Sequence, residues 1–290
     1  MELQINYWDP TSMPDDATIL VVGARHTGKS VLTRDIMWHK KNNLDLVIGM
    51  NPTEMGSKTL SYFTAPAFQF HRFDEEKLTH LLDWQRRCVA NKKAMRVGFV
   101  MDDCMAETNG KTGGKKKVMN SGDIIKVFKL GRWLNLFYLN CMQFIKDAPP
   151  EIRGNVDLLF CFNTSSTAER EKLWKEYFAM IGTFKDFNKV FESCAKGFDC
   201  IVLDRRKALR EPKNCIFYYR ATIREPFHTG REIFWTMSEK YFVDKADYSM
   251  DPTRVLGGGV QKEKTIFIKN EQKPETLDDL LQRIENPLEE

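Results

Sequence analysis

The chain has 290 residues and a net charge of +4, and its 42% hydrophobic content is enough to bury a sizeable core. This composition excludes a disordered chain, and no apolar run approaches the roughly 18 residues of a membrane span. The seven cysteines form no CxxC pair or zinc spacing. Several of them, such as Cys141 and Cys161, lie inside apolar strand-like runs, which indicates buried, reduced thiols in a cytosol-like compartment. Residues 1–16 contain four acids and no basic side chain, unlike a signal peptide.

The first predicted strand, Ile19 to Val22, leads into a turn that matches G-x-x-x-x-G-K-[ST] at every fixed position, and a helix is predicted after it. The glycines bring backbone N–H groups against phosphate oxygens, the lysine reaches the β- and γ-phosphates, and the serine hydroxyl ligates Mg²⁺. We therefore expect an ATP and Mg²⁺ site here, with Ser30 on the metal. Its nucleotide-binding residues are Gly23, Ala24, Arg25, His26, Thr27, Gly28, Lys29, Ser30 and Val31.

Alternating strands and helices are predicted along the rest of the chain. An extended lead-in precedes residue 17, and residues 53–65 are rich in turn-forming residues. Further strands are expected at 44–50, 68–72, 96–101, 134–142, 156–162, 200–203 and 215–219. Helices are expected at 31–41, after 74, and at 123–130, 165–178, 184–194 and 230–242. This pattern predicts an α/β fold with a mostly parallel central sheet, helices on both faces, and ligands at the carboxyl ends of the strands.

Two polar strand ends are expected to join the phosphate loop at that edge. The apolar run from Val97 ends on Asp102 and Asp103, which has the form of a Walker B strand. Asp102 is expected to hold Mg²⁺, and Asp103 to accept a proton from the attacking water or to orient it. Gln143 ends the next strand, where its amide can contact the γ-phosphate or the water.

A glycine-rich stretch with four lysines follows the Walker B strand. Lysines on flexible backbone suit sequence-independent contacts with DNA phosphates, and the alternative is a solvated loop. The predicted DNA-binding residues are Lys111, Lys115, Lys116 and Lys117. Tryptophans elsewhere are expected in the core rather than as base-stacking platforms, namely Trp133, Trp174 and Trp235.

Four motifs appear in a fixed order: Gly23–Ser30, Val97–Asp103, the strand from Arg132 to Gln143, and Pro149–Asp157. Over roughly residues 15–245 the chain resembles the FtsK–HerA group of DNA-pumping ATPases, and within it the poxvirus-type genome-packaging ATPases of nucleocytoplasmic large DNA viruses. The resemblance implies a P-loop NTPase of the additional-strand (RecA/FtsK-like) type. Together with the prolines of the lead-in, the Gly257–Gly259 run and the acids of residues 271–290, it predicts an N-terminal extension at 1–16, an ATPase domain at 17–248, and a linker with an acidic tail at 249–290.

The resemblance also implies how such an ATPase works. It implies a ring, pentameric or hexameric, around double-stranded DNA, with capsid components as further partners, in the host cytoplasm at the viral factory and in the virion. Arg132 matches the position from which an arginine acts on a neighbour's ATP, and Arg153 is the alternative. Many members carry Asp-Glu at the end of Walker B, whereas this chain has Asp102-Asp103, so Glu107 stays open as the base.

Other interpretations of the same motifs remain. A cellular DNA segregation or helicase motor shares them, and a small-molecule kinase shares the phosphate loop. The kinase needs an arginine-rich lid and an acceptor pocket, neither of which is located in the sequence. A non-hydrolysing nucleotide-dependent scaffold is disfavoured by the intact Asp102, Asp103 and Gln143.

Overall fold

The structure, a computed structural model, describes residues 4–104, 107–109, 115–207 and 211–241. The chain divides into two compact units, Met1–Gly258 and Gly259–Glu290, and the second lies outside the described residues. The predicted boundary at residue 249 therefore stays a prediction. Among the helices that are described, none combines the length and the apolar character needed to cross a bilayer.

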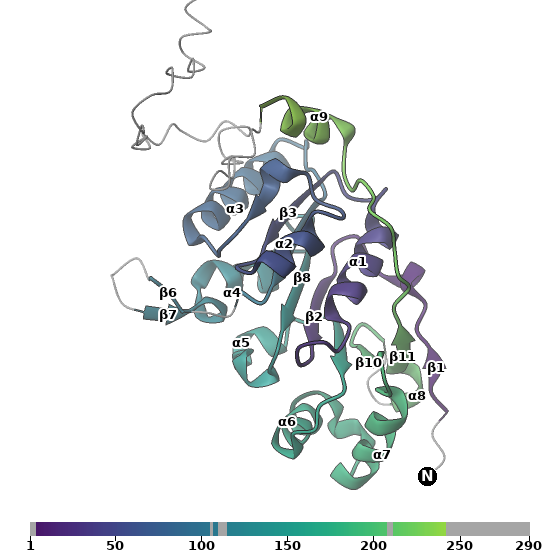
Figure 1. The fold of residues 1–290 in the computed structure, drawn as a ribbon. Helices are drawn as coiled ribbons and strands as arrows, with labels where there is room; N and C mark the ends of the chain where they lie inside the picture. Colours follow the sequence, from purple (N-terminus) through teal and green to yellow (C-terminus); the bar gives the residue numbers. More distant parts are fainter. Residues whose placement is uncertain (1–3, 105–106, 110–114, 208–210, 242–290) are drawn as a thin grey trace, which may run out of the picture. The chain divides into compact units, whose positions relative to one another are not determined.

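A nine-stranded sheet forms the centre of the first unit (Figure 1). In spatial order its strands are β1 (Asn6–Tyr7), β11 (Ile216–Arg220), β10 (Asp199–Asp204), β9 (Leu158–Phe162), β2 (Thr18–Val22), β8 (Leu136–Met142), β5 (Val97–Asp102), β3 (Leu46–Met50) and β4 (Gln69–Phe70). All neighbouring pairs are parallel except those that β10 makes with β9 and with β11. The predicted mostly parallel sheet is confirmed.

The position of β8 identifies the type of sheet. It pairs in parallel with β2 on one side and with β5 on the other, so the strand that follows the Walker B strand in the chain separates it from the phosphate-loop strand. This inserted strand is the feature that the additional-strand prediction required. Because the strands from β9 through β2, β8 and β5 to β3 run parallel, their carboxyl ends meet at one edge.

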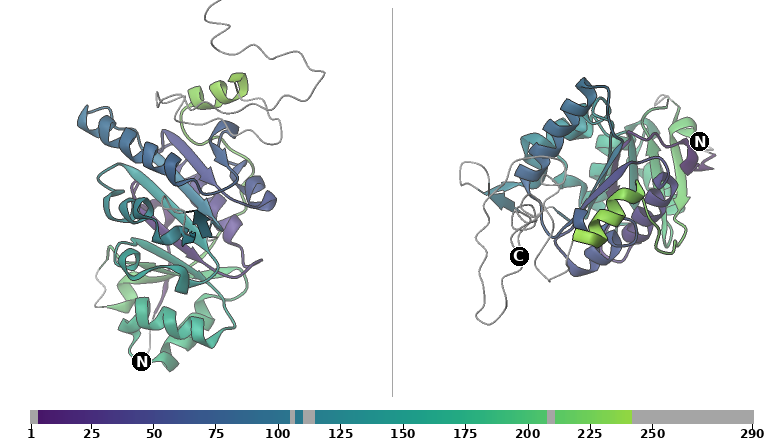
Figure 2. Two further views of the ribbon diagram at one scale, coloured as in Figure 1. Left: turned by 90° about the vertical axis from the view of Figure 1, so that its left-hand side faces the viewer. Right: turned by 90° about the horizontal axis from the view of Figure 1, so that it is seen from above.

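Helices cover both faces of the sheet (Figures 1 and 2). They are α1 (Lys29–Lys40), α2 (Glu54–Leu60), α3 (Glu75–Ala90), α4 (Gly122–Leu130), α5 (Pro150–Arg153), α6 (Thr167–Leu173), α7 (Phe184–Cys194), α8 (Pro212–Cys215) and α9 (Glu232–Tyr241). Strand side chains alternate between the faces: Ile19 and Val21 join one apolar cluster with α1, whereas Leu20 and Val22 join another with α3, α4 and α7. Both faces are buried, which explains the unbroken apolar runs.

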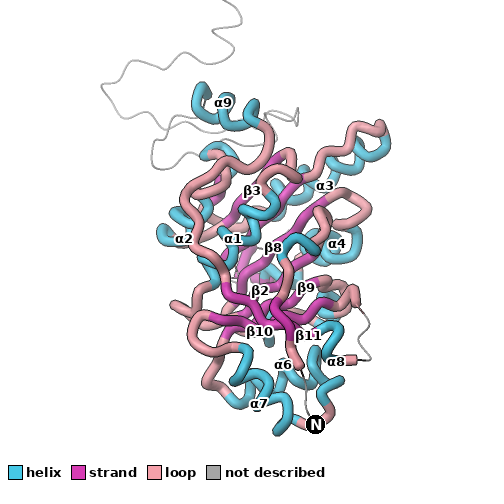
Figure 3. The backbone as a smooth tube through the Cα atoms, turned by 90° about the vertical axis from the view of Figure 1, so that its right-hand side faces the viewer, coloured by secondary structure: helices cyan, strands magenta, loops and turns pink. Residues whose placement is uncertain are grey.

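Several element predictions are wrong in detail. Residues 53–65 contain α2, because the Thr53 side chain caps the helix by accepting from the Gly56 N–H at 3.1 Å. The N-terminal lead-in contains β1, which joins the edge of the sheet beside β11. The helix expected at 165–178 is α6 followed by a π-helical turn at Trp174–Phe178, and the strand expected at 68–72 shortens to β4. Figure 3 shows α6 and α7 beyond the β10–β11 side of the sheet.

An extended segment after β11 is tied to the phosphate-loop helix through one buried carboxylate. Asp35 of α1 is fully buried and accepts from the Tyr219 hydroxyl at 2.5 Å, the Thr222 N–H at 2.9 Å and the Arg224 guanidinium at 2.7 Å. The Arg224 guanidinium also lies 3.8 Å from the centroid of the Trp38 ring. The residues that follow run beside α1 and α2 to α9 (Figure 1). Asp35 therefore couples the last sheet strand to the helix that carries the phosphate loop.

We expect Asp35→Asn to lower the free energy of unfolding by about 3 kcal/mol, because the Arg224 guanidinium, only 20% exposed, loses the fully buried carboxylate that pairs with it. The measurement is urea unfolding at neutral pH. Arg231→Gln is the matched control: Arg231 also ties this segment to the body, through Asp45 at 2.8 Å, but its side chain is 61% exposed. Its loss should remain below about 1 kcal/mol. Equal losses for the two variants would contradict the role given to Asp35.

Candidate nucleotide-binding site

The phosphate loop connects the end of β2 to the start of α1. Gly28 caps α1 with φ of 108°, a left-handed conformation that strains other residues. The N–H of Gly23 donates to the Met142 carbonyl at 3.1 Å, which joins the loop to the end of β8. The Lys29 ammonium donates to the carbonyls of Gly23 and Ala24 at 2.6 and 2.8 Å. Its charge is thus held over the loop, where phosphates are expected.

Glycine is also required in this loop because aromatic side chains pack against it. A Cβ added to Gly23 would lie 2.9 Å from the Cβ of Phe162, closer than atoms can pack. A Cβ on Gly28 would lie 3.3 Å from Phe162 Cε1 and 3.5 Å from Phe198 Cδ1. The end of β9 and the turn before β10 therefore border the loop on the side opposite β8.

Asp102 ends β5 as a buried carboxyl, with 7% of its surface exposed. Burial raises its pKa from 3.8 to about 6, and this effect outweighs the opposing influence of the Lys29 ammonium, while the neighbouring Asp103 raises the pKa further. Ionising this buried carboxyl costs free energy although the Lys29 ammonium is near, and a bound cation would offset that cost. The site therefore suits a metal ligand.

Asp103 and Gln143 meet at the ends of neighbouring strands. The Gln143 amide donates to both carboxylate oxygens of Asp103, each at 3.0 Å, and the Asp103 N–H donates to the Cys141 carbonyl at 3.2 Å. Asp103 has φ of 55°, which is uncommon for a residue with a side chain. The structure thus brings these two residues into direct contact at the edge where the sequence predicted both of them.

Asn51 completes this edge and was missed in the sequence analysis. It follows β3, is 1% exposed, and accepts from the Thr53 N–H at 2.7 Å through Oδ1. Its Nδ2 has no hydrogen-bond partner among the described residues, although the amide lies close enough to Asp102 to lower the pKa of that carboxyl. Gly56 leaves room for it, because a Cβ there would overlap the amide. The only signal in the sequence was its place at a strand end.

The oxygen donors at this edge fit Mg²⁺. Ser30 supplies a hydroxyl at the start of α1 and Asp102 a buried carboxylate, and Mg²⁺ prefers oxygen ligands. Across the part of the chain that is described, no group of three or more His, Cys, Asp or Glu side chains is arranged to hold a metal alone. Mg²⁺ is commonly held by one or two side chains together with substrate phosphates, and Ser30 and Asp102 would be those side chains here.

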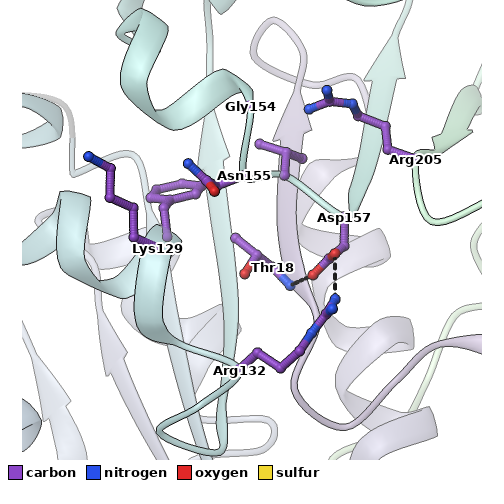
Figure 4. A pocket seen from close by; sticks show the side chains of 9 residues that line it. Thr18, Lys129, Arg132, Gly154, Asn155, Asp157 and Arg205 are labelled. Atoms are coloured by element: carbon purple, nitrogen blue, oxygen red, sulfur yellow. Dashed lines mark hydrogen bonds and ion pairs between the residues drawn. The ribbon is translucent and has the colours of Figure 1, made fainter.

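Arg132 precedes β8 and lies at the amino ends of the parallel strands, whereas the phosphate loop lies at their carboxyl ends. It pairs with Asp157 at 2.8 Å and approaches Asp16 at 3.9 Å, yet its side chain is 62% exposed (Figure 4). The seven residues of β8 separate it from Gln143, a span on the order of 20 Å. Arg132 therefore lies far from the phosphate loop of its own chain. Trp133, which was expected in the core, is 62% exposed beside it, so that prediction is wrong.

A pocket of about 300 Å³ lies at this amino-terminal edge and not at the phosphate loop. Figure 4 shows the Asp157 carboxylate between the backbone of Thr18 and the guanidinium of Arg132. Its lining residues precede or begin strands β2, β8 and β9: Thr18, Phe128, Lys129, Arg132, Gly154, Asn155, Val156 and Asp157, with Arg205 after β10. The pocket is therefore separate from the candidate nucleotide site.

Arg153 is committed to contacts within its own chain. Only 15% of its side chain is exposed, and it pairs with Glu176 at 2.5 Å and donates to the Ala148 carbonyl at 2.9 Å. An arginine that acts on a neighbouring subunit needs a free guanidinium. This geometry favours Arg132 over Arg153 for that role.

The predicted lysine loop is in part a β-hairpin. Strand β6 (Glu107–Asn109) pairs antiparallel with β7 (Lys115–Lys117), and Glu107 lies opposite Lys117. Lys117 is exposed and lies 3.7 Å from Asp147, whereas Lys111 lies outside the described residues. Glu107 is thus in the hairpin and not at the edge of the main sheet.

Asp102→Asn should stabilise the chain at high pH. Folding raises the pKa of this carboxyl from 3.8 to about 6, so ionised Asp102 lowers the free energy of unfolding. This loss is complete above about pH 6 and disappears below about pH 4. The gain in free energy of unfolding should reach up to about 3 kcal/mol at pH 8 and be clearly smaller at pH 5. Urea unfolding without nucleotide or Mg²⁺ measures it, and a gain that does not depend on pH would contradict the assignment.

Proteins similar in sequence to this chain come from large DNA viruses. No family model matches the chain. A protein of Invertebrate iridescent virus 3 described as uncharacterized is 29% identical over 74% of this chain and 79% of its own length. Another uncharacterized protein, from Acanthamoeba polyphaga mimivirus, is 26% identical over 89% of this chain and 90% of its own length.

Among solved structures, the chain is similar to the genome packaging NTPase B204 from Sulfolobus turreted icosahedral virus 2 in complex with AMPPCP. The TM-score is 0.51 at 18% identity, over 72% of this chain and 100% of that one. The chain thus has the P-loop ATPase fold of the FtsK type. The resemblance inferred from the sequence is confirmed in that fold, which a viral genome packaging NTPase shares, and in the relatives, which are proteins of large DNA viruses.

Proposed function

We propose that this protein hydrolyses ATP to move double-stranded DNA during packaging of a viral genome, as a ring of identical subunits. The observation that carries the proposal is the edge of the sheet where the phosphate loop faces a buried Asp102 and an Asp103 held by Gln143. The wider resemblance to packaging ATPases supports DNA as the partner.

The residues of the site divide the work of phosphoryl transfer. The Lys29 ammonium exchanges its loop carbonyls for β- and γ-phosphate oxygens, and the N–H groups of the loop bind the same phosphates. Ser30 and Asp102 hold Mg²⁺, which when bound neutralises charge on the phosphates. The unpaired Nδ2 of Asn51 offers a donor to an oxygen at the same edge.

Asp103 is the proposed base. Its carboxylate lies at the strand end, and Gln143 holds it through both oxygens, so the pair is placed to orient a water against the γ-phosphate. Glu107 is the alternative, but it lies in the β6–β7 hairpin. Lys111, Lys115, Lys116 and Lys117 are proposed to contact DNA phosphates without reading sequence. Capsid components as partners, and activity at the viral factory in the host cytoplasm and in the virion, belong to the same proposal.

The decisive measurement is steady-state ATP hydrolysis with and without duplex DNA. Wild-type protein should hydrolyse ATP only with Mg²⁺, and DNA of unrelated sequences should stimulate it equally. Lys29→Ala should abolish turnover, because the γ-phosphate loses its cation. Asp103→Asn should still bind ATP and hydrolyse it poorly, while Glu107→Gln should keep activity.

Each contrary result has a definite meaning. Turnover in Lys29→Ala equal to wild type would refute the phosphate site. Loss of hydrolysis in Glu107→Gln but not in Asp103→Asn would make Glu107 the base. ATPase activity that DNA leaves unchanged, together with phosphate transfer to a small molecule, would favour a kinase over a motor.

Arg132 is proposed to act on the ATP of the neighbouring subunit. Neither Arg132→Ala nor Lys29→Ala protein should hydrolyse ATP alone, but mixed rings should recover part of the activity. In such a ring an Arg132→Ala subunit keeps an intact phosphate loop, and its Lys29→Ala neighbour supplies the arginine. Co-purification of untagged subunits of one variant with tagged subunits of the other first establishes that mixed rings form. Mixed rings without recovered activity would show that Arg132 does not act in trans.

Arg153→Ala is the comparison variant. Because Arg153 pairs with Glu176 inside its own subunit, its removal should lower stability, and its inactive fraction should not be rescued by mixing with Lys29→Ala subunits. Rescue by Arg153→Ala instead of Arg132→Ala would transfer the role to Arg153.

A further inference from the structure

Phe198 is an exposed aromatic side chain at the border of the phosphate loop. It is 65% exposed, the highest fraction among the described phenylalanines that are exposed. A Cβ on Gly28 would lie 3.5 Å from its Cδ1, so the ring reaches the residue that caps α1. An apolar ring left in water beside a nucleotide loop is unfavourable unless something covers it.

The fold places the Phe198 ring beside the phosphate loop, at the carboxyl ends of the parallel strands. Because β10 runs antiparallel to β9, its first residues lie at the carboxyl end of β9, where Cys200 pairs with Phe162. Gly197 has φ of 65° in the turn that precedes it. Asp199 fixes this turn through two contacts. Its N–H donates to the Lys196 carbonyl at 3.1 Å, and its carboxylate pairs with Arg220 at 2.5 Å.

The order of the strands sets the direction in which a nucleotide lies. Asp102 ends β5 and Asp103 follows it, while Gln143 follows β8, and both strands lie on one side of β2. On the other side of β2 come β9 and then β10. A nucleotide whose γ-phosphate lies toward Asp102 and Asp103 therefore extends across the loop toward β9 and β10, where Phe198 is exposed.

We propose that Phe198 stacks on the base of the bound nucleotide and so supplies the base-binding part of the site. This inference rests on the proposed ATPase function and adds a residue to it. Phe162 lies beneath the loop at 2% exposed and has no free face, so Phe198 is the ring available to the base. Stacking on a phenyl ring provides affinity without reading hydrogen-bond donors and acceptors, so Phe198 contributes equally to adenine and guanine nucleotides.

The test compares binding of ATP, GTP and inorganic tripolyphosphate, each with Mg²⁺, by isothermal titration calorimetry. Phe198→Ala should weaken ATP and GTP by a similar factor of about 5 to 150, the range found for loss of one base–aromatic stack. It should leave the affinity for tripolyphosphate, which has no base, unchanged. Phe198→Trp should retain wild-type affinity for ATP, and its fluorescence should change with ATP but not with tripolyphosphate.

Ile233→Ala is the matched control, because it truncates an apolar side chain that is 59% exposed on α9 and should change none of these affinities. Unchanged ATP affinity in Phe198→Ala, or equal losses for ATP and tripolyphosphate, would overturn the inference and leave the ATPase proposal standing. A wild-type chain that binds neither ATP nor tripolyphosphate would overturn the ATPase proposal and this inference with it.

Discussion

The parallel pairing of β8 with both β2 and β5 is the constraint on which the rest of the site depends. It aligns Val22 with Met142 and Asp102 with Cys141, so the phosphate loop, Asp103 and Gln143 all emerge at one edge. The hydrogen bond from the Gly23 N–H to the Met142 carbonyl continues this ladder into the loop itself. A shift of β8 by one residue would turn its side chains to the other face and separate Gln143 from Asp103.

Unfavourable local features are concentrated at that edge. Asp102 has a raised pKa because it is buried, Asn51 keeps an unpaired buried donor, and Asp103 has a positive φ. Each of them costs free energy that the two apolar clusters on the faces of the sheet offset. All three groups are arranged around the place where a phosphate and a metal are proposed to bind. This concentration is typical of a site built for a ligand.

In the proposed ring, the carboxyl ends and the amino ends of the parallel strands have different functions. The nucleotide residues emerge at the carboxyl ends of the strands, while Arg132 and the exposed Trp133 lie at the amino ends. One strand, β8, connects them, with Gln143 after its last residue and Arg132 ahead of its first. This buried strand thus joins the candidate nucleotide site of a subunit to the surface that we propose acts on its neighbour.

The sequence by itself determined the elements whose signal is local. The phosphate loop, the apolar strands, the helix at Phe184–Cys194 and the two acids after β5 follow from short patterns of residues, and the resemblance added the additional-strand type. Local patterns also misled: residues 53–65 suggested turns, whereas they contain a capped helix in which Gly56 makes room for the Asn51 amide. Only the tertiary structure decided that Asn51 borders Asp102, that Arg153 is paired within its chain, and that Phe198 reaches the phosphate loop. These contacts join strands far apart in the chain, and their hydrogen-bond register depends on the packing of the whole sheet, which no short stretch of residues encodes.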